Sequence, residues 1–202
     1  MQEIDQDIPD DATPEEIAAE QFGAPGANDD VIMPMVLALD PLGAPPPVAP
    51  TMPIDWQIIA NFYTACISSD PRVTYHLGSK IPSDTAVPGV DFTHVDCSGF
   101  VRACIRRSTH PQVLFPDGSV VQHDWVAASR YATSSVADGL LVDGKIRIAF
   151  LAPGAAPGHS VGHVVLIHNG YTVESHGSTG PDRRQWTGAD WQHYTSVFVL
   201  AG

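Results

Sequence analysis

The sequence predicts an α+β fold in which helices pack on an antiparallel sheet. Two segments, 55–68 and 97–108, carry apolar residues at helical spacing, and both precede a series of short apolar runs. Two of these runs, 162–168 and 171–175, are joined by Asn169-Gly170, a dipeptide typical of a tight β-hairpin. A helical half followed by a meander of strands is typical of α+β architecture.

The elements follow one another in a simple order. A first helix is expected to begin after Asp55, a favourable N-cap, and to end near Ser68. A second helix is expected from Cys97 to about Ser108, and Asp124 is expected to cap a short third helix over 125–131. The remaining elements are an extended piece at 73–78 and strands at 145–152, 162–168, 171–175 and 194–200.

The N-terminal quarter of the chain differs in composition from the rest. Residues 1–53 contain ten of the 18 prolines and one aromatic residue, Phe22. Residues 1–52 contain 11 of the 23 acidic residues and no Lys or Arg. Such a segment does not bury enough apolar surface to offset its ordering entropy. We therefore predict a largely disordered acidic, Pro- and Ala-rich leader or linker at 1–53, followed by one folded domain at 54–202.

The composition also argues against several classes of protein. The last 150 residues hold 12 acidic and ten basic residues without a basic stripe, so no nucleic-acid partner is expected. The apolar run 31–39 contains Pro34 and is too short to span a membrane. The first residues are acidic where a signal peptide is basic, so synthesis in the cytoplasm without a signal peptide is expected. No CxxC or HExxH spacing indicates a metal site, and no cofactor is expected.

Cys97 is the strongest candidate for a nucleophile. It lies in Asp96-Cys97-Ser98-Gly99, at the first turn of the second predicted helix. The unpaired N–H groups and the positive dipole end found there favour a thiolate, which is the reactive form. Gly99 leaves room for a substrate backbone beside the sulfur. The alternative interpretation is a buried structural cysteine at the start of a core helix.

A cysteine nucleophile needs a base, and His163 is the best candidate among the nine histidines. It opens an apolar strand directly after a Gly-rich loop. In a two-residue Asn169-Gly170 hairpin, paired residues have numbers that sum to 339, which places His163 opposite His176. The alternatives are a strand-end histidine bonded to the backbone for His163 and an ordinary loop histidine for His176.

These motifs resemble those of the NlpC/P60 cysteine peptidases, over about residues 54–200. The matching motifs are Tyr75-x-x-Gly78, Asp96-Cys97-Ser98-Gly99-Phe100-Val101, Gly162-His163-Val164-Val165-Leu166-Ile167 and a polar residue closing the next strand. The family has a papain-like fold with helices packed on an antiparallel sheet, in which a cysteine at a helix N-terminus faces a histidine on a strand. The chain has Gly78-Ser79 where the family usually has Gly-Gly, and it lacks the family's Pro-Gly-Asp motif before the histidine.

The resemblance implies a cysteine amidohydrolase or endopeptidase that cleaves the peptidoglycan stem peptide, commonly between D-γ-glutamyl and the diamino acid. It implies a Cys-His-His triad and a thioester intermediate, with Cys97 as nucleophile, His163 as base and His176 as the orienting residue. Substrate-binding or oxyanion roles are implied for Tyr75, Asp96 and Ser98. Without a signal peptide, such an enzyme would reach the cell wall as a phage lysin or virion component or as a secreted effector, with residues 1–53 binding a delivery or virion partner.

Two other functions use the same residues differently. A papain-like acyltransferase or deamidase acting on a protein or lipid would keep the same nucleophile and base and change the acyl acceptor. A non-catalytic phage structural module would keep only the fold. The joint presence of Cys97, His163 and His176 favours an enzyme, because a packing module needs none of the three.

Overall fold

The computed structural model describes residues 52–177 and 179–202. The prediction of a disordered leader therefore lies almost wholly outside the described residues. The helices are α2 (Trp56–Ser68), α3 (Cys97–Ser108) and α4 (Ser119–Ala128), with two 3₁₀ helices, η1 (Val136–Leu140) and η2 (Asp190–Tyr194). The strands are β1 (Ala132–Ser134), β2 (Ile146–Leu151), β3 (His163–His168), β4 (Tyr171–His176), β5 (Gly180–Asp182) and β6 (Ser196–Ala201).

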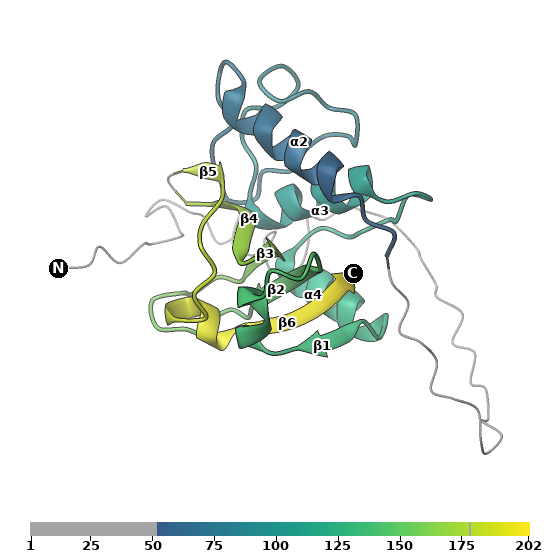
Figure 1. Ribbon diagram of the computed structural model, residues 1–202. Coiled ribbons are helices and arrows are strands. Elements are labelled where there is room, and N and C mark those ends of the chain that lie inside the picture. The colour runs from purple at the N-terminus through teal and green to yellow at the C-terminus, as the bar shows by residue number, and fades with distance from the viewer. Residues whose placement is uncertain (1–51, 178) are drawn as a thin grey trace.

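All six strands form one antiparallel sheet in the order β1-β6-β2-β3-β4-β5. Strands β2 to β5 follow one another along the chain as a meander, and β6 returns to lie between β1 and β2 (Figure 1). The predicted α+β class, with helices on an antiparallel sheet, is confirmed. No helix in the described part of the chain is both long and apolar enough to cross a membrane.

The β3–β4 hairpin has the predicted register. Leu166 pairs with Val173, Ile167 with Thr172 and His168 with Tyr171, so each pair of numbers sums to 339. Asn169 and Gly170 both have positive φ, at 50° and 78°. Two consecutive residues with positive φ are what a type I′ turn requires, and this turn matches the twist of the flanking strands.

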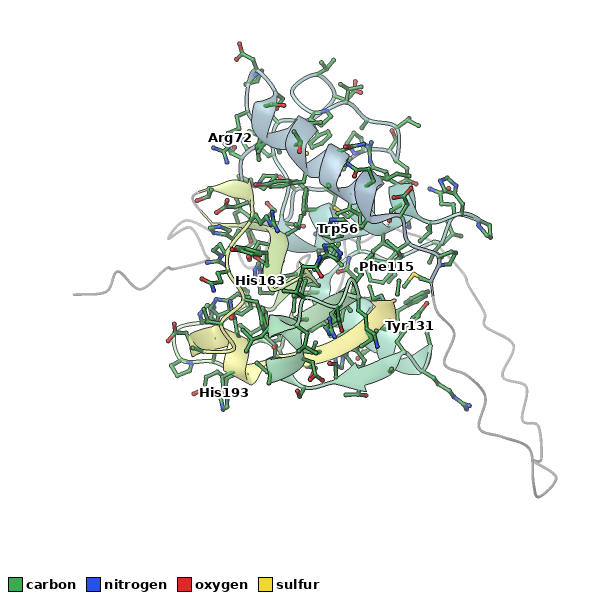
Figure 2. All side chains as sticks on the ribbon, in the orientation of Figure 1. Trp56, Arg72, Phe115, Tyr131, His163 and His193 are labelled. Carbon is green, nitrogen blue, oxygen red and sulfur yellow. The ribbon has the colours of Figure 1, made fainter. Side chains whose placement is uncertain are left out.

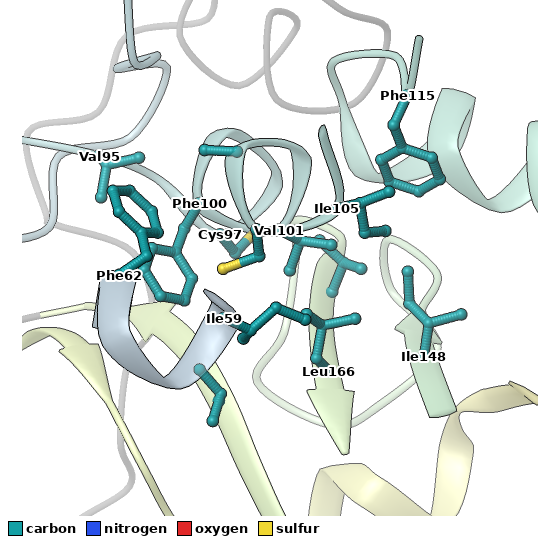
Figure 3. Packing of buried hydrophobic residues seen from close by; sticks show 14 of the residues in the cluster. Ile59, Phe62, Val95, Cys97, Phe100, Val101, Ile105, Phe115, Ile148 and Leu166 are labelled. Carbon is teal, nitrogen blue, oxygen red and sulfur yellow. The ribbon is translucent and has the colours of Figure 1, made fainter. Parts of the chain in front are cut away.

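The main core lies between the helices and one face of the sheet. Ile59 and Phe62 of α2 meet Phe100 and Val101 of α3, and this layer packs on a sheet face that includes Leu166 (Figure 3). Figure 1 shows α2 and α3 together on one side of the sheet. A smaller apolar cluster forms elsewhere around Ala149, Val165, Ile167, Trp186 and Val197. Val165 and Ile167 alternate with Leu166 along β3, so the second cluster lies on the opposite face.

The first two helices begin and end as predicted. Asp55 accepts a hydrogen bond from the Gln57 N–H at 2.8 Å, and α2 ends at Ser68. The α3 helix runs from Cys97 to Ser108, with Asp96 as its N-cap.

The third helix was predicted wrongly. It begins at Ser119 rather than after Asp124, because Gly118 takes a φ of 80° and turns the chain into the helix six residues earlier. Its buried face includes Gln122, whose side chain donates to the carbonyls of Ser98 and Pro116. A polar residue on the buried face hides the apolar periodicity that would otherwise mark this helix in the sequence.

Candidate active site

Cys97 is the first residue of α3, and Asp96 fixes the start of this helix. The Gly99 N–H donates to Asp96 Oδ1 at 2.6 Å, which satisfies one of the free N–H groups of the first turn. Cys97 is 1% exposed and contributes to the main core beside Phe100 and Val101 (Figure 3). The thiol therefore lies at the positively polarised end of a helix, in a largely dehydrated setting.

A buried ion pair lies beside this cysteine. The Lys80 ammonium pairs with Asp96 Oδ2 and also donates to Ser98 Oγ at 2.7 Å. Ser98 Oγ in turn donates to Asp96 Oδ1 at 3.1 Å, and both Asp96 and Ser98 are 0% exposed. Their side chains therefore bind Lys80 and the α3 N-terminus, and a direct role in substrate binding remains a prediction.

His163 begins β3 and is bound to a carboxylate that the sequence did not single out. His163 Nε2 lies 2.8 Å from Glu174 Oε2, and the two side chains are only 5% and 0% exposed. Arg184 donates from Nη2 to Oε2 at 2.8 Å and from Nε to Oε1 at 3.1 Å. Thr172 Oγ1 also donates to Oε1. The Glu174 carboxylate is therefore enclosed by donors on both oxygens.

These donors keep the Glu174 carboxylate ionised. Burial of Glu174 tends to raise its pKa, but the hydrogen bonds and charges of His163 and Arg184 outweigh it and hold the pKa well below the usual range. An ionised carboxylate only accepts hydrogen bonds, so the proton on the His163 ring must be on Nε2. Nδ1 is then the basic nitrogen, available to take a proton from a thiol or to deliver one to a leaving group.

On the sheet face opposite the main core, Trp191 contacts His163, and Trp186 contacts Trp191. The Trp191 ring stands edge-on to His163 with centroids 5.3 Å apart, and Trp186 stands edge-on to Trp191 at 6.1 Å. The Arg184 guanidinium lies 5.6 Å from the Trp191 ring centroid. Figure 2 shows His163 beside the C-terminal segment of the chain that carries these residues. The Trp191 contact and the hydrogen bond to Glu174 both favour this orientation of the imidazole.

His176 has a different neighbour from the one expected. Its Nε2 lies 3.3 Å from Asp182 Oδ2 on β5, and its Nδ1 is buried without a partner among the described residues. Glu174 lies two residues before His176 on the same face of β4, and its carboxylate contacts His163. The predicted hairpin register thus identified the face of β4 that meets His163. The sequence feature that could have identified the actual partner is a single carboxylate in the buried run Thr172–His176. The role of His176 remains a prediction.

The nucleophile and base candidates are connected through β4. Ser175 Oγ donates to the Val95 carbonyl at 2.8 Å, which ties β4 to the segment that leads into Cys97. Glu174, the preceding residue, binds His163. The α3 helix also packs against both β3 and β4. The structure therefore brings the N-terminus of α3 and the His163–Glu174 pair to the same strand from its two sides.

The strand pairing of β3 locates His163 relative to the β3–β4 hairpin. The β3–β4 pairs run from Leu166 to His168, whereas the β2–β3 pairs continue to His163. His163 therefore lies beyond the paired part of the hairpin, at the end of β3 that pairs with β2 alone.

Tyr75 is half-buried and follows Thr74. Thr74 forms a bridge with His94, and its carbonyl accepts the Val95 N–H at 3.0 Å. Tyr75 is thus held beside the segment that precedes Cys97.

The other two cysteines are structural. Cys66 and Cys104 are both 0% exposed on α2 and α3. Burial raises the pKa of the Cys66 thiol to about 12 and raises that of Cys104 well above its ordinary value. Neither thiol will ionise near neutral pH.

In residues 52–177 and 179–202, no three His, Cys, Asp or Glu side chains are grouped in a way that would hold a metal ion. No family model matches the chain, and no curated protein matches it.

Proposed function

We propose that this chain is a cysteine amidohydrolase or endopeptidase that cleaves an amide bond in the stem peptide of bacterial peptidoglycan, between D-γ-glutamyl and the diamino acid. One observation carries the proposal. A buried histidine, held in one tautomer by an ionised carboxylate, begins β3, and α3, the helix whose first residue is Cys97, packs against β3 and β4. The identity of the substrate comes from the resemblance of the Tyr75, Cys97 and His163 motifs to the NlpC/P60 peptidases.

The proposed chemistry proceeds in two stages. Nδ1 of His163 takes the proton of Cys97, and the thiolate attacks the carbonyl carbon of the scissile amide. The backbone N–H of Cys97 stabilises the oxyanion, and His163 then protonates the leaving amine as the C–N bond breaks. Water, deprotonated by His163, attacks the thioester, and the products are a carboxylic acid and the free thiol.

Glu174 takes the orienting role in this scheme. It keeps the proton on Nε2 and stabilises the imidazolium that forms when Nδ1 is protonated. Arg184 and Thr172 keep Glu174 ionised. His176, paired with Asp182, then lies one position further along the same face. The papain-like fold, action on the cell wall through a phage or non-classical secretion route, and a delivery partner for residues 1–53 belong to the same proposal.

The test is mass spectrometry of soluble products released from purified peptidoglycan of known stem peptides by the full chain. We expect new fragments whose masses identify a D-γ-glutamyl–diamino acid cleavage, and none from the Cys97→Ala variant. Fragments that persist in Cys97→Ala would contradict the proposed nucleophile. Intact peptidoglycan, with a Cys97-dependent acyl transfer or deamidation of an added protein or lipid, would favour the transferase or deamidase alternative.

A further inference from the structure

An apolar groove of about 340 Å³ lies between α2 and the loop at 85–88. The lining positions on α2 are three or four residues apart, so they share one face of the helix. The apolar residues that line the groove are Ile58, Phe62 and Ala65 on α2 and Ala86, Val87 and Pro88 on the loop. Val87 is 51% exposed, and the volume is within the range of about 300–1,000 Å³ that ligand sites occupy. The groove therefore presents apolar surface that a short apolar segment can cover.

The two walls of the groove are held in place by the protein itself. The Val87 N–H donates to Asp91 Oδ2 at 2.7 Å, and the Val87 carbonyl accepts the Asp91 N–H at 2.8 Å. Arg107 Nη2 donates to the Ala86 carbonyl at 2.7 Å, and the Arg107 guanidinium lies 4.2 Å from the Phe62 ring centroid. Arg107 thus links the loop to α2. A groove that is already formed loses little conformational entropy when it binds a segment.

Arg107 also gives the groove a positive charge. It is the one charged residue among the described residues that line the groove. Its side chain donates to the carbonyls of Ser83 and Ala86. The Asp84 carboxylate binds Gln112 at 2.6 Å instead. Burial lowers the pKa of Arg107, so a carboxylate that faces the guanidinium would stabilise its charged form. The groove is therefore suited to an apolar segment with an acidic residue beside it.

The N-terminal part of the chain contains a segment of this composition. Residues 31–39, VIMPMVLAL, are apolar and lie between Asp30 and Asp40. The first 52 residues contain no Lys or Arg, so this run has no basic neighbour that would repel Arg107. Its two methionines have flexible side chains of the kind that fill irregular gaps. The run lies outside the described residues, and its chemistry matches that of the groove.

The chain enters the folded domain close to this groove. The Asp55 N–H donates to the Ser108 carbonyl at 2.9 Å, and Ser108 follows Arg107 at the end of α3. Residues 40–51 connect the run to the described chain, and a linker of this length spans up to about 40 Å. The α2 helix, with 13 residues, is about 20 Å long. The run can therefore reach the groove of its own chain, at an effective concentration on the order of 1 mM.

We infer that the groove between α2 and the loop at 85–88 binds residues 31–39 of the same chain. Apolar side chains of the run contact Ile58, Phe62 and Val87, and an aspartate beside the run faces Arg107. A second copy of the chain offers the same run only at its bulk concentration, so the tethered run is the favoured occupant. Residues 1–30 are then left for the delivery or virion partner proposed above.

Photo-cross-linking in the full chain tests this contact. The photoreactive residue p-benzoylphenylalanine replaces Val87 in the groove or, as a control, the 81% exposed Val142 in the loop before β2. An equal mixture of ¹⁴N- and ¹⁵N-labelled chains is irradiated, and the cross-linked peptides are identified by mass spectrometry. We expect position 87 to cross-link to residues 29–40 within one chain, and position 142 not to cross-link to them.

Two variants and a matched control make the test specific. The double variant Val36→Gln/Leu37→Gln makes the run more polar, and Ala65→Glu places a charge in the groove at an exposed site. Each should lower the yield of the cross-link from position 87 about tenfold, the effect of removing one large apolar side chain from a buried contact. Thr64→Glu, at an exposed α2 site outside the groove, should leave the yield unchanged.

Three results would overturn the inference. Cross-links that join ¹⁴N- to ¹⁵N-labelled chains would identify a second copy as the occupant. The absence of a cross-link from position 87 to residues 29–40, or cross-links spread evenly over residues 1–51, would show that the run does not bind the groove. A yield that Ala65→Glu and the double variant leave unchanged would show that the contact does not depend on these apolar surfaces.

Discussion

Asp96 and Glu174 are both fully buried carboxylates that lie beside a proposed catalytic residue, yet their partners differ. Asp96 binds Lys80 and the N–H of Gly99, so it fixes the backbone that carries Cys97. Glu174 binds Arg184 and the ring of His163, so it fixes the protonation of a side chain. The same functional group thus positions main chain at one site and selects a tautomer at the other, according to the donors around it.

Loss of the nucleophile should have the largest effect. Cys97→Ala should lower kcat/KM by about 10⁴-fold or more, because nucleophile and base act as one unit. Cys66→Ala removes a buried thiol that does not ionise near neutral pH, so it should lower stability while hydrolysis is retained. Release of stem-peptide fragments followed by mass spectrometry compares the two variants. Equal losses in both would show that Cys97 has no special role.

Removal of the charge on Glu174 should come next. Glu174→Gln keeps the shape of the side chain but weakens stabilisation of the His163 imidazolium, so kcat should fall about 10²–10⁴-fold. His176→Asn should cost less, because His176 is paired with Asp182. Steady-state kinetics with circular dichroism as a check on folding separates catalysis from stability. A larger loss in His176→Asn would support His176 rather than Glu174 as the orienting residue.

Removal of the charge on Asp96 should act mainly on stability. Asp96→Asn keeps an acceptor for the α3 N-terminus but leaves Lys80, which is 13% exposed, without its counter-charge. We expect the free energy of unfolding to fall by about 3 kcal/mol, as measured by urea denaturation. Asp124→Asn changes a carboxylate that is 75% exposed and leaves no buried cation unpaired, so it should cost less. If Asp96→Asn instead raises KM at unchanged stability, the predicted substrate contact of Asp96 is supported.

The smallest effect is a pH dependence of stability. The folded pKa of Glu174 lies below its ordinary value of 4.5, so the ionised group stabilises the fold above that pH. This contribution is lost as the pH falls from about 4.5 toward the folded pKa. Urea denaturation between pH 7 and 3 should therefore show a steeper loss for the unmodified chain than for Glu174→Gln. Parallel curves would contradict the assigned ionisation.

Local signals in the sequence predicted a large part of the fold and some of the site. The Asp55 cap, the start of α3 at Cys97 and the Asn169-Gly170 register depend on residues a few positions apart, and all three are as predicted. The start of α4 was missed, because the turn at Gly118 and the buried contacts of Gln122 outweigh the cap signal at Asp124.

The sequence by itself determined the order of helices and strands, the hairpin pairing and the position of Cys97 at a helix N-terminus. Only the tertiary structure decided that Glu174 is the partner of His163. A buried carboxylate needs a counter-charge, and Arg184, which follows β5 in the chain, supplies it. It also decided that Lys80, 16 residues before Asp96, holds the other carboxylate. Backbone geometry determines pairings between residues that are close in sequence. The partners of a buried charge are instead the donors, distant in sequence, that the fold brings next to it.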